Sequence, residues 1–247
     1  MNYEPNRQRS HVDREALGLK PGLKPVRRIR PKSRRISRPG NFATVKTFAR
    51  QPIRTESVME MDGLAHIEIN PRYVRIAPQP HRLTYHVTKP DGSTRVATYV
   101  PDLAVLTIEG DVVIVDFKSR YLRGLPEWAE VESVIREAYR IDHGAAFTVL
   151  TEEHFAIEPR RSNVAIMLMH RPPQEDAAAI AAVRGAIGRI GLPSTIGAIR
   201  SDSGLPSDGI SDSAFSALVE LAISGEVTMS MAKPFDDLTV IDVGPFS

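Results

Sequence analysis

Residues 99–118 read YVPDLAVLTIEGDVVIVDFK, and this stretch decides the fold expected of the chain. Two runs rich in Val, Ile and Leu, residues 102–108 and 112–118, flank a turn around Gly110. Aliphatic and β-branched runs on either side of a glycine turn predict an antiparallel hairpin. The VVIV run before Asp116 is typical of a buried central strand.

The expected hairpin brings charged side chains together at one end. A turn centred on Gly110 pairs residues whose numbers sum to about 220, which places Asp102 opposite Lys118. Asp116 shares that face because it lies two residues before Lys118, while Phe117 points to the other face. Two carboxylates and an ammonium group, with Cβ atoms roughly 5 Å apart across the strands, suit a hard, oxygen-seeking cation such as Mg²⁺. The alternative is a solvated cross-strand ion pair without catalytic meaning.

The composition restricts the kinds of protein to consider. The chain has 247 residues, of which 42% are hydrophobic, enough for a core and one or two domains. It has no cysteine, which excludes disulfides, thiolate zinc sites and a cysteine nucleophile. No apolar run approaches the roughly 18 residues that span a bilayer, and no secretory signal is visible. We therefore expect a cytoplasmic protein without a membrane partner.

The charge is distributed unevenly. Residues 1–50 contain 14 Lys and Arg but 3 Asp and Glu, a net charge of +11, so the other 197 residues carry 18 basic and 27 acidic groups, a net −9. A basic arm on an acidic body indicates a polyanionic partner, and double-stranded DNA fits it through salt-dependent phosphate contacts. A solubilising, disordered tail is the alternative. The candidate contacts here are Arg27, Arg28, Arg30, Arg34, Arg35 and Lys46.

Three parts are expected along the chain: a basic flexible arm (1–40), an α/β core (41–155) and a C-terminal module (156–247). In the core the patterns predict a helix over 55–66, strands over 73–87, 94–100 and 145–151, and a helix over 127–141. In the module, helices over 175–191 and 211–225 precede a β-ribbon. This order resembles a winged-helix module, and its few basic residues favour contact with protein over DNA.

Residues 38–155 resemble the TnsA-like endonucleases of cut-and-paste transposons, which belong to the PD-(D/E)xK nuclease superfamily. The resemblance implies a restriction-endonuclease-like core, a mixed sheet flanked by helices. The matching stretches, in order, are Arg38-Pro-Gly-Asn-Phe-Ala-Thr-Val-Lys46, Thr55-Glu-Ser-Val-Met-Glu60, Gln79-Pro80, Tyr99-Val-Pro-Asp102, Val115-Asp-Phe-Lys118 and Val149-Leu-Thr-Glu-Glu153.

The resemblance implies a catalytic set of Glu60, Asp102 and Lys118, with Asp116 two positions before the lysine. Glu60, Asp102, Asp116 and the Phe117 carbonyl would hold Mg²⁺ or Mn²⁺. The enzyme would cut the strand at transposon ends that a DDE-type transposase leaves intact. It would act with that transposase and with an AAA+-type ATPase regulator, and associate with the nucleoid when active.

Several alternatives stay open from the sequence. Ser57 and Glu60 also match a helix capping box, and Glu56 competes with Glu60 as a ligand. Arg120, Arg123, Arg136 and Arg140 are candidate phosphate contacts near the site, or ordinary surface charge. The chain could also be a stand-alone restriction or repair nuclease, or a DNA-binding adaptor that keeps the scaffold without its activity.

Overall fold

The protein has a mixed α/β structure in two compact units. The computed structural model describes residues 2–3, 12–27, 29, 40–88, 92–171, 176–206 and 212–247. The first unit comprises Met1–Leu64 and Arg72–His154, and the second comprises Ala65–Pro71 and Phe155–Ser247. Among the described residues, no helix has both the length and the apolar character needed to cross a membrane.

A four-stranded mixed sheet forms the centre of the first unit. Its strands are β4 (Tyr73–Pro78), β7 (Leu103–Thr107), β8 (Val112–Phe117) and β9 (Ala146–Leu150), in the order β4-β7-β8-β9. β7 is antiparallel to both β4 and β8, whereas β9 runs parallel to β8. The predicted hairpin is therefore the middle of the sheet, and its two strands are almost wholly buried.

The register of the hairpin differs from the prediction. Leu103 pairs with Val115, and the other pairs of β7 and β8 also have numbers that sum to 218. The next pair in this register places Asp102 opposite Asp116. The expected pairing of Asp102 with Lys118 is therefore wrong by two residues, and Lys118 lies beyond the acid pair.

The turn explains this shift. The Thr107 N–H donates to the Asp111 carbonyl (2.9 Å), so residues 108–110 form a three-residue loop. Gly110 is its last residue and has a φ of 93°, in the left-handed region that glycine adopts without steric cost. A type I turn followed by such a residue is a common three-residue hairpin connection. The centre of the hairpin is thus Glu109, not Gly110.

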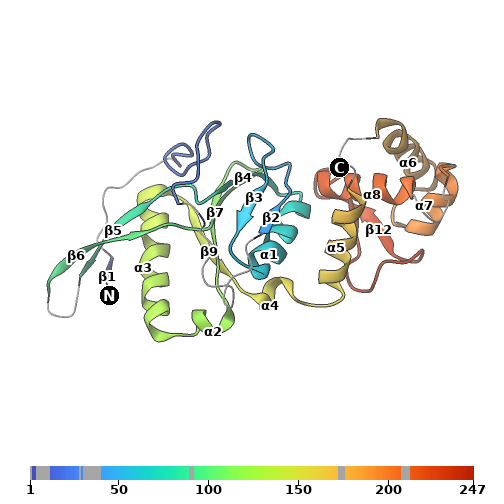
Figure 1. Cartoon of the computed structure of the whole chain (residues 1–247). Coiled ribbons are helices and arrows are strands. Elements are labelled where there is room, and N and C mark those ends of the chain that lie inside the picture. The colour runs from blue at the N-terminus through green and yellow to red at the C-terminus, as the bar shows by residue number, and fades with distance from the viewer. Residues whose placement is uncertain are drawn as a thin grey trace. The chain divides into compact units, whose positions relative to one another are not determined.

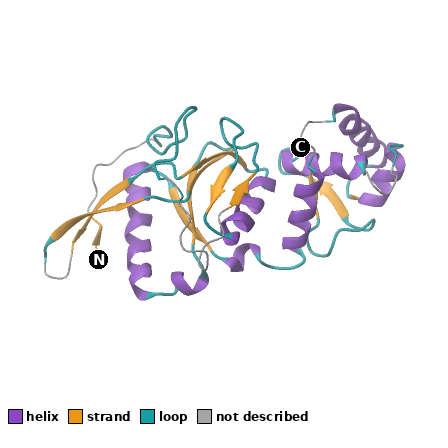
Figure 2. Cartoon of the chain, in the orientation of Figure 1, coloured by secondary structure: helices purple, strands orange, loops and turns teal. Residues whose placement is uncertain are grey.

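Helices cover both faces of the sheet (Figures 1 and 2). α3 (Pro126–His143) packs its apolar side against the face that carries Val112 and Ile114. α1 (Val58–Ile69) lies on the opposite face, where a Cβ on Gly63 would come within 2.2 Å of the Phe117 ring. Because glycine permits this close approach, the first turn of α1 reaches the strand end that carries Asp116. The short helix α2 (Arg120–Arg123) connects β8 to α3.

Part of the predicted arm is packed. Leu17 and Leu19 are buried in the same core as α3 and residues 83–87, and the Cβ of Pro80 lies against Gly18. The Leu17 carbonyl also lies 3.2 Å from Nδ1 of His81. Residues 12–27 therefore do not behave as the flexible arm that their charge predicts, because their leucines complete the core.

Two smaller sheets also belong to the described part of the first unit. β5 (Leu83–Thr88) and β6 (Thr94–Tyr99) form a hairpin, and β1 (Asn2–Tyr3) pairs with β5. β2 (Gly40–Phe42) and β3 (Ile53–Thr55) form a separate two-stranded sheet that leads into α1.

The second unit is a helical cluster with a small sheet. It contains α5 (Arg160–His170), α6 (Ala177–Ile190), β10 (Ser194–Thr195), α7 (Ile196–Ser203), α8 (Ser213–Ser224), β11 (Val227–Met229) and β12 (Val240–Val243), while α4 (Glu152–Phe155) precedes them. The sheet order is β10-β12-β11. Asp176, Thr195 and Asp212 cap α6, α7 and α8. The core centres on α8, where Leu218 and Val219 are fully buried.

We expect Gly110→Ala to lower the stability of the first unit. A φ of 93° forces an L-residue into the left-handed region, at a cost of about 1–2 kcal/mol. The measurement is the midpoint of urea unfolding. Asp111→Ala, an exposed neighbour, is the control and should change stability by less than about 0.5 kcal/mol. Equal stability of the two variants would contradict the role assigned to the loop.

We also expect acid to destabilise the contact between the N-terminal segment and α3. His81 hydrogen bonds to the Tyr139 hydroxyl (2.8 Å). Burial, then the nearby His143, lowers the pKa of His81 from 6.5 to about 4. The folded state therefore binds fewer protons than the unfolded state between these values, and stability falls as the pH drops through this window.

The loss should approach about 3 kcal/mol when the pH falls from 7 to 4. Urea unfolding at a series of pH values, compared with the same series for His81→Gln, isolates this contribution, because other groups titrate alike in both proteins. Parallel curves for the two proteins would show that His81 is not the group responsible.

Candidate functional site

Two aspartates face each other at the end of the buried hairpin. Asp116 lies in β8 with only 1% of its surface exposed. Asp102 precedes β7, and its Oδ2 accepts a hydrogen bond from the Phe117 N–H (2.9 Å). The Asp102 carbonyl accepts a second bond from the Gln79 N–H (2.8 Å). The backbone on both sides therefore holds Asp102 against Asp116.

The proximity of the two carboxylates shows in their electrostatics. Burial raises the pKa of Asp102 well above its ordinary value, and Asp116 raises it further, whereas the Phe117 N–H opposes this rise. Burial and the charge of Asp116 also raise the pKa of the Tyr99 hydroxyl, which stays protonated. Two close carboxylates in a dry environment are stabilised by a cation between them.

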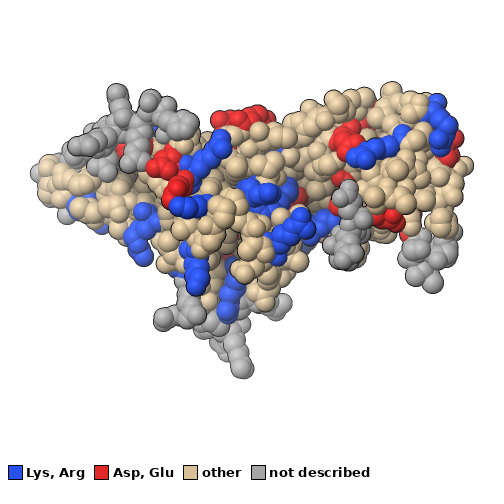
Figure 3. Space-filling view, turned by 90° about the horizontal axis from the view of Figure 1, so that it is seen from above, with Lys and Arg blue, Asp and Glu red and all other residues tan. Residues whose placement is uncertain are grey.

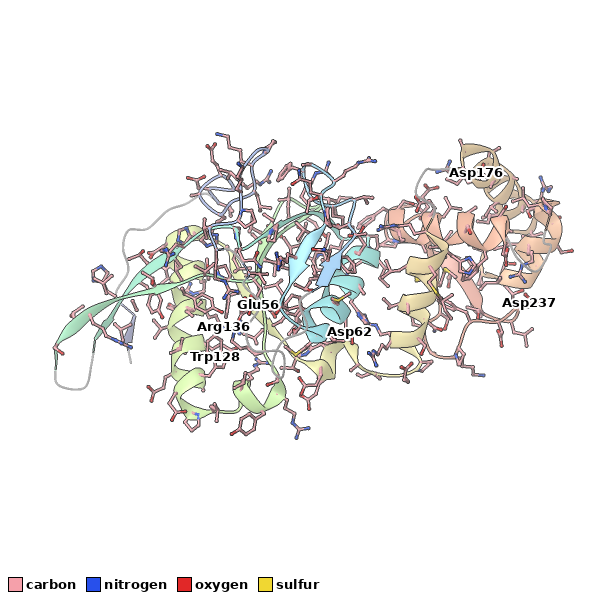
Figure 4. All side chains as sticks on the ribbon, in the orientation of Figure 1. Glu56, Asp62, Trp128, Arg136, Asp176 and Asp237 are labelled. Atoms are coloured by element: carbon pink, nitrogen blue, oxygen red, sulfur yellow. The ribbon has the colours of Figure 1, made fainter. Side chains whose placement is uncertain are left out.

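Lys118 supplies part of that positive charge. Its Nζ lies 2.7 Å from Asp116 Oδ2 and 4.7 Å from the centroid of the Trp128 ring. Trp128 belongs to the first turn of α3, as Figure 4 shows. The lysine, predicted from the strand alternation, thus lies beside the acid pair, and its aromatic neighbour was not predicted.

Glu60 lies in the first turn of α1. Its Oε2 accepts from the Glu56 N–H (2.8 Å), and Ser57 Oγ accepts from the Glu60 N–H (3.2 Å). This is a capping box, although the backbone group reached is Glu56 rather than Ser57. Burial raises the pKa of Glu60, and its charge in turn raises the pKa of Asp102, so the two groups interact.

An arginine from the N-terminal segment enters the same cluster. Arg27 Nη2 lies 3.0 Å from Glu56 Oε1 and 3.8 Å from Asp102 Oδ1. The preceding residue, Val26, donates its N–H to the Gln79 carbonyl (2.9 Å). Gln79 therefore joins the backbone of Asp102 to the segment that carries Arg27. The sequence suggested Arg27 only as a DNA contact, and no local pattern reveals a partner 75 residues away.

These residues fit the chemistry of a divalent-metal site. Asp102, Asp116 and Glu60 provide carboxylate oxygens, and the Phe117 carbonyl is the fourth predicted ligand. Mg²⁺ and Mn²⁺ prefer such oxygen ligands. Within the described ranges, however, no three acidic or histidine side chains are already arranged as a metal-binding group. The carboxylates lie close together, and Lys118 and Arg27 supply positive charge of the kind that a bound metal would supply.

The other predicted phosphate contacts differ in placement. Arg28, Arg30, Arg34 and Arg35 lie outside the described residues. Lys46 is 7% exposed, which leaves it little surface for a phosphate. Arg120 is well exposed but pairs with Glu153 (3.0 Å), and Arg140 pairs with Glu137 (2.5 Å). Figure 3 shows both basic and acidic side chains exposed on that face.

Arg123 and Arg136 take part in a network that the sequence analysis missed. Both bind the buried carboxylate of Glu132, with Nη2 to Oε1 distances of 3.1 and 2.8 Å. The Trp128 Nε1 donates to the same residue (3.2 Å to Oε2). Residues 128, 132 and 136 lie on one helix face because they are spaced by four, and this spacing was the available signal. Figure 4 shows Trp128 and Arg136 on α3.

Comparison of the sequence with protein-family models and with curated proteins finds no match to either.

We expect Arg27→Gln to strengthen the binding of a divalent cation. Arg27 presents its charge to Glu56 and Asp102, so a second cation meets repulsion there. With the guanidinium partly exposed, the effect should be about 1 kcal/mol, or roughly a fivefold lower Kd. Calorimetric titration with Mn²⁺ measures it. Lys24→Gln, an exposed change in the same segment, should leave the Kd unaltered, and so would Arg27→Gln if its guanidinium does not compete.

Proposed function

We propose that this chain is a metal-dependent DNA endonuclease subunit that cuts one strand at transposon ends, with Mg²⁺ or Mn²⁺ as cofactor. The observation that carries the proposal is the convergence of Asp102, Asp116 and Lys118 at one end of the central strands, with Glu60 of α1 beside them. A structural ion pair needs one acid and one base, whereas this strand end holds two buried acids and a lysine. It matches the set that the TnsA-like resemblance implies.

The topology supports a restriction-endonuclease-like core as the finer description of the first unit. A mixed sheet with antiparallel β4, β7 and β8, a parallel β9 and helices on both faces agrees with it. In this arrangement the acid pair lies at the end of the two most buried strands. A rigid, dry strand end holds ligand oxygens more accurately than a surface loop.

Each of these residues has its own role in the proposed phosphodiester hydrolysis. A bound divalent cation would supply charge neutralisation at the phosphate and a lower pKa for the attacking water. Asp102 and Asp116 hold it, and Glu60 can add a ligand because a carboxylate accepts more hydrogen bonds than its cap uses. The Phe117 N–H fixes the orientation of Asp102. Lys118 places an ammonium group beside the reacting phosphate oxygens, where negative charge develops.

The second unit supports a role in assembly. Its order α6-β10-α7-α8-β11-β12 and its three-stranded sheet are consistent with a winged-helix-like module. Helix α8, with the sequence SAFSALVELAIS, has no Lys or Arg with which to read DNA. We therefore propose that this unit contacts proteins, namely the DDE-type transposase or the AAA+-type ATPase regulator. The protein would act in the cytoplasm, at the nucleoid.

One observation favours a second candidate, a DNA-binding adaptor without catalysis. Arg27 and Lys118 already compensate the acid cluster, with Nη2 and Nζ 3.0 and 2.7 Å from Glu56 and Asp116. A site that needs no metal for charge balance could persist without activity. The two candidates differ in whether the site binds a divalent cation.

Calorimetry separates them. We expect Mn²⁺ and Ca²⁺ to bind the protein saturably in the presence of short duplex DNA, and Asp116→Asn or Asp102→Asn to weaken binding at least about tenfold, since each removes a charged ligand. Lys118→Gln should bind the cation but lose cleavage in the assembled complex. Asp111→Asn, an exposed acid at the other end of the hairpin, is the matched control.

Absence of cation binding would decide between the two candidates in the other direction. If the folded wild-type protein binds duplex DNA but no divalent cation, the endonuclease proposal fails and the adaptor is supported. Binding that survives Asp116→Asn and Asp102→Asn alike would place the cation elsewhere in the protein.

A further inference from the structure

The side chain of Lys118 has two neighbours of different character. Asp116 Oδ2 lies 2.7 Å from Nζ, and the Trp128 ring centroid lies 4.7 Å from it. The ring is also 6.1 Å from that of Tyr99, which borders the acid pair. The lysine is only about a quarter exposed. Its ammonium group is therefore held between a carboxylate and an aromatic face.

The indole is itself fixed in place. Its Nε1 donates to Glu132 (3.2 Å), and the Glu132 carboxylate is 12% exposed. Arg123 of α2 and Arg136 of α3 bind the same carboxylate, and Arg136 also donates to the Phe147 carbonyl. Glu132 thus holds the indole Nε1, and the two arginines hold Glu132. An exposed tryptophan of ordinary packing would not need such a set of polar contacts.

The two neighbours of Lys118 would act differently during catalysis. A divalent cation on Asp116 would occupy the carboxylate oxygens that now bind Nζ, and it would repel the ammonium group. An aromatic ring attracts a cation through its quadrupole, about 0.5–2 kcal/mol, without accepting a proton. The ring can therefore keep the ammonium group charged and close to the acid pair when Asp116 no longer binds it.

We propose that Trp128 is a positioning residue for Lys118, holding its ammonium group in place through the aromatic face, while Glu132 fixes the ring. This inference depends on the proposed nuclease function, because it assigns Trp128 a role in that reaction. Lys118 touches the reacting phosphate, and Trp128 acts only through Lys118.

The direct test is the position of the lysine under the ring. Protons on the Lys118 side chain should show an upfield ring-current shift in NMR spectra of ¹³C-lysine-labelled protein, which has seven lysines. Lys118→Arg identifies the signal. We expect the shift to persist when Ca²⁺ and duplex DNA are added, and to vanish in Trp128→Leu. Tyr121→Leu, which alters an exposed aromatic side chain of α2, should leave it unchanged.

Cleavage in the assembled complex gives a second readout. Trp128→Leu should lower kcat about tenfold, whereas the Mn²⁺ Kd stays within twofold, since the metal ligands are intact. Trp128→Phe retains an aromatic face and should recover part of the rate. A merely structural tryptophan would lower stability and metal affinity together, and phenylalanine and leucine would then behave alike.

The outcomes separate this inference from the proposed function. If Ca²⁺ binds and the ring-current shift disappears, the lysine leaves the ring and the positioning role is overturned, although the nuclease proposal stands. A shift that persists while no cation binds overturns the nuclease proposal, and with it the role assigned here to Trp128. If Trp128→Leu fails to fold, two measurements still test whether Trp128 positions Lys118. They are cleavage by Trp128→Phe and the ring-current shift of the wild-type protein.

Discussion

The register of β7 on β8 places Asp102 directly opposite Asp116, and the charge cluster of the first unit depends on this placement. A three-residue loop ending in Gly110 sets the register, and a shift of one residue would turn one carboxylate to the other face of the sheet. Because both groups are largely buried, their charges interact strongly, and the pKa of Asp102 rises. The surrounding elements bring either positive charge or hydrogen-bond donors to this pair.

Those contributions come from segments far apart in the chain. Lys118 directly follows β8, and Arg27 reaches the cluster from the N-terminal segment, whose backbone is tied to Gln79. α1 adds Glu60 because Gly63 lets the helix lie against Phe117. α3 adds the ring that Lys118 faces. Segments that are far apart in the chain thus pack so that their charged, polar and aromatic groups surround the acid pair.

The second unit has a different character. Its core is formed by α8 with parts of α6, α7 and the small sheet, and the exposed ion pairs on it join residues of the unit itself, such as Arg184 with Glu226. A unit in which Arg184, Arg189 and Arg200 are already paired, and whose most buried helix carries no basic residue, has little to offer a phosphate backbone. This contrast agrees with the proposed division, in which the first unit would perform the chemistry and the second would contact protein.

The sequence by itself determined the hairpin, the flanking helices and the residue types of the site. Strand alternation placed Asp116 and Lys118 on one face, because side-chain direction in a strand depends only on residue number. It misjudged the register, since the loop is centred on Glu109 and not on Gly110, and local backbone geometry around that glycine decides which residue is the centre. It also left α5 and α7 unpredicted, as short helices carry weak periodicity. Only the tertiary structure decided that Arg27 joins the acid cluster and that Trp128 lies against Lys118. These contacts join distant segments, and no local pattern of residues records which segments will meet.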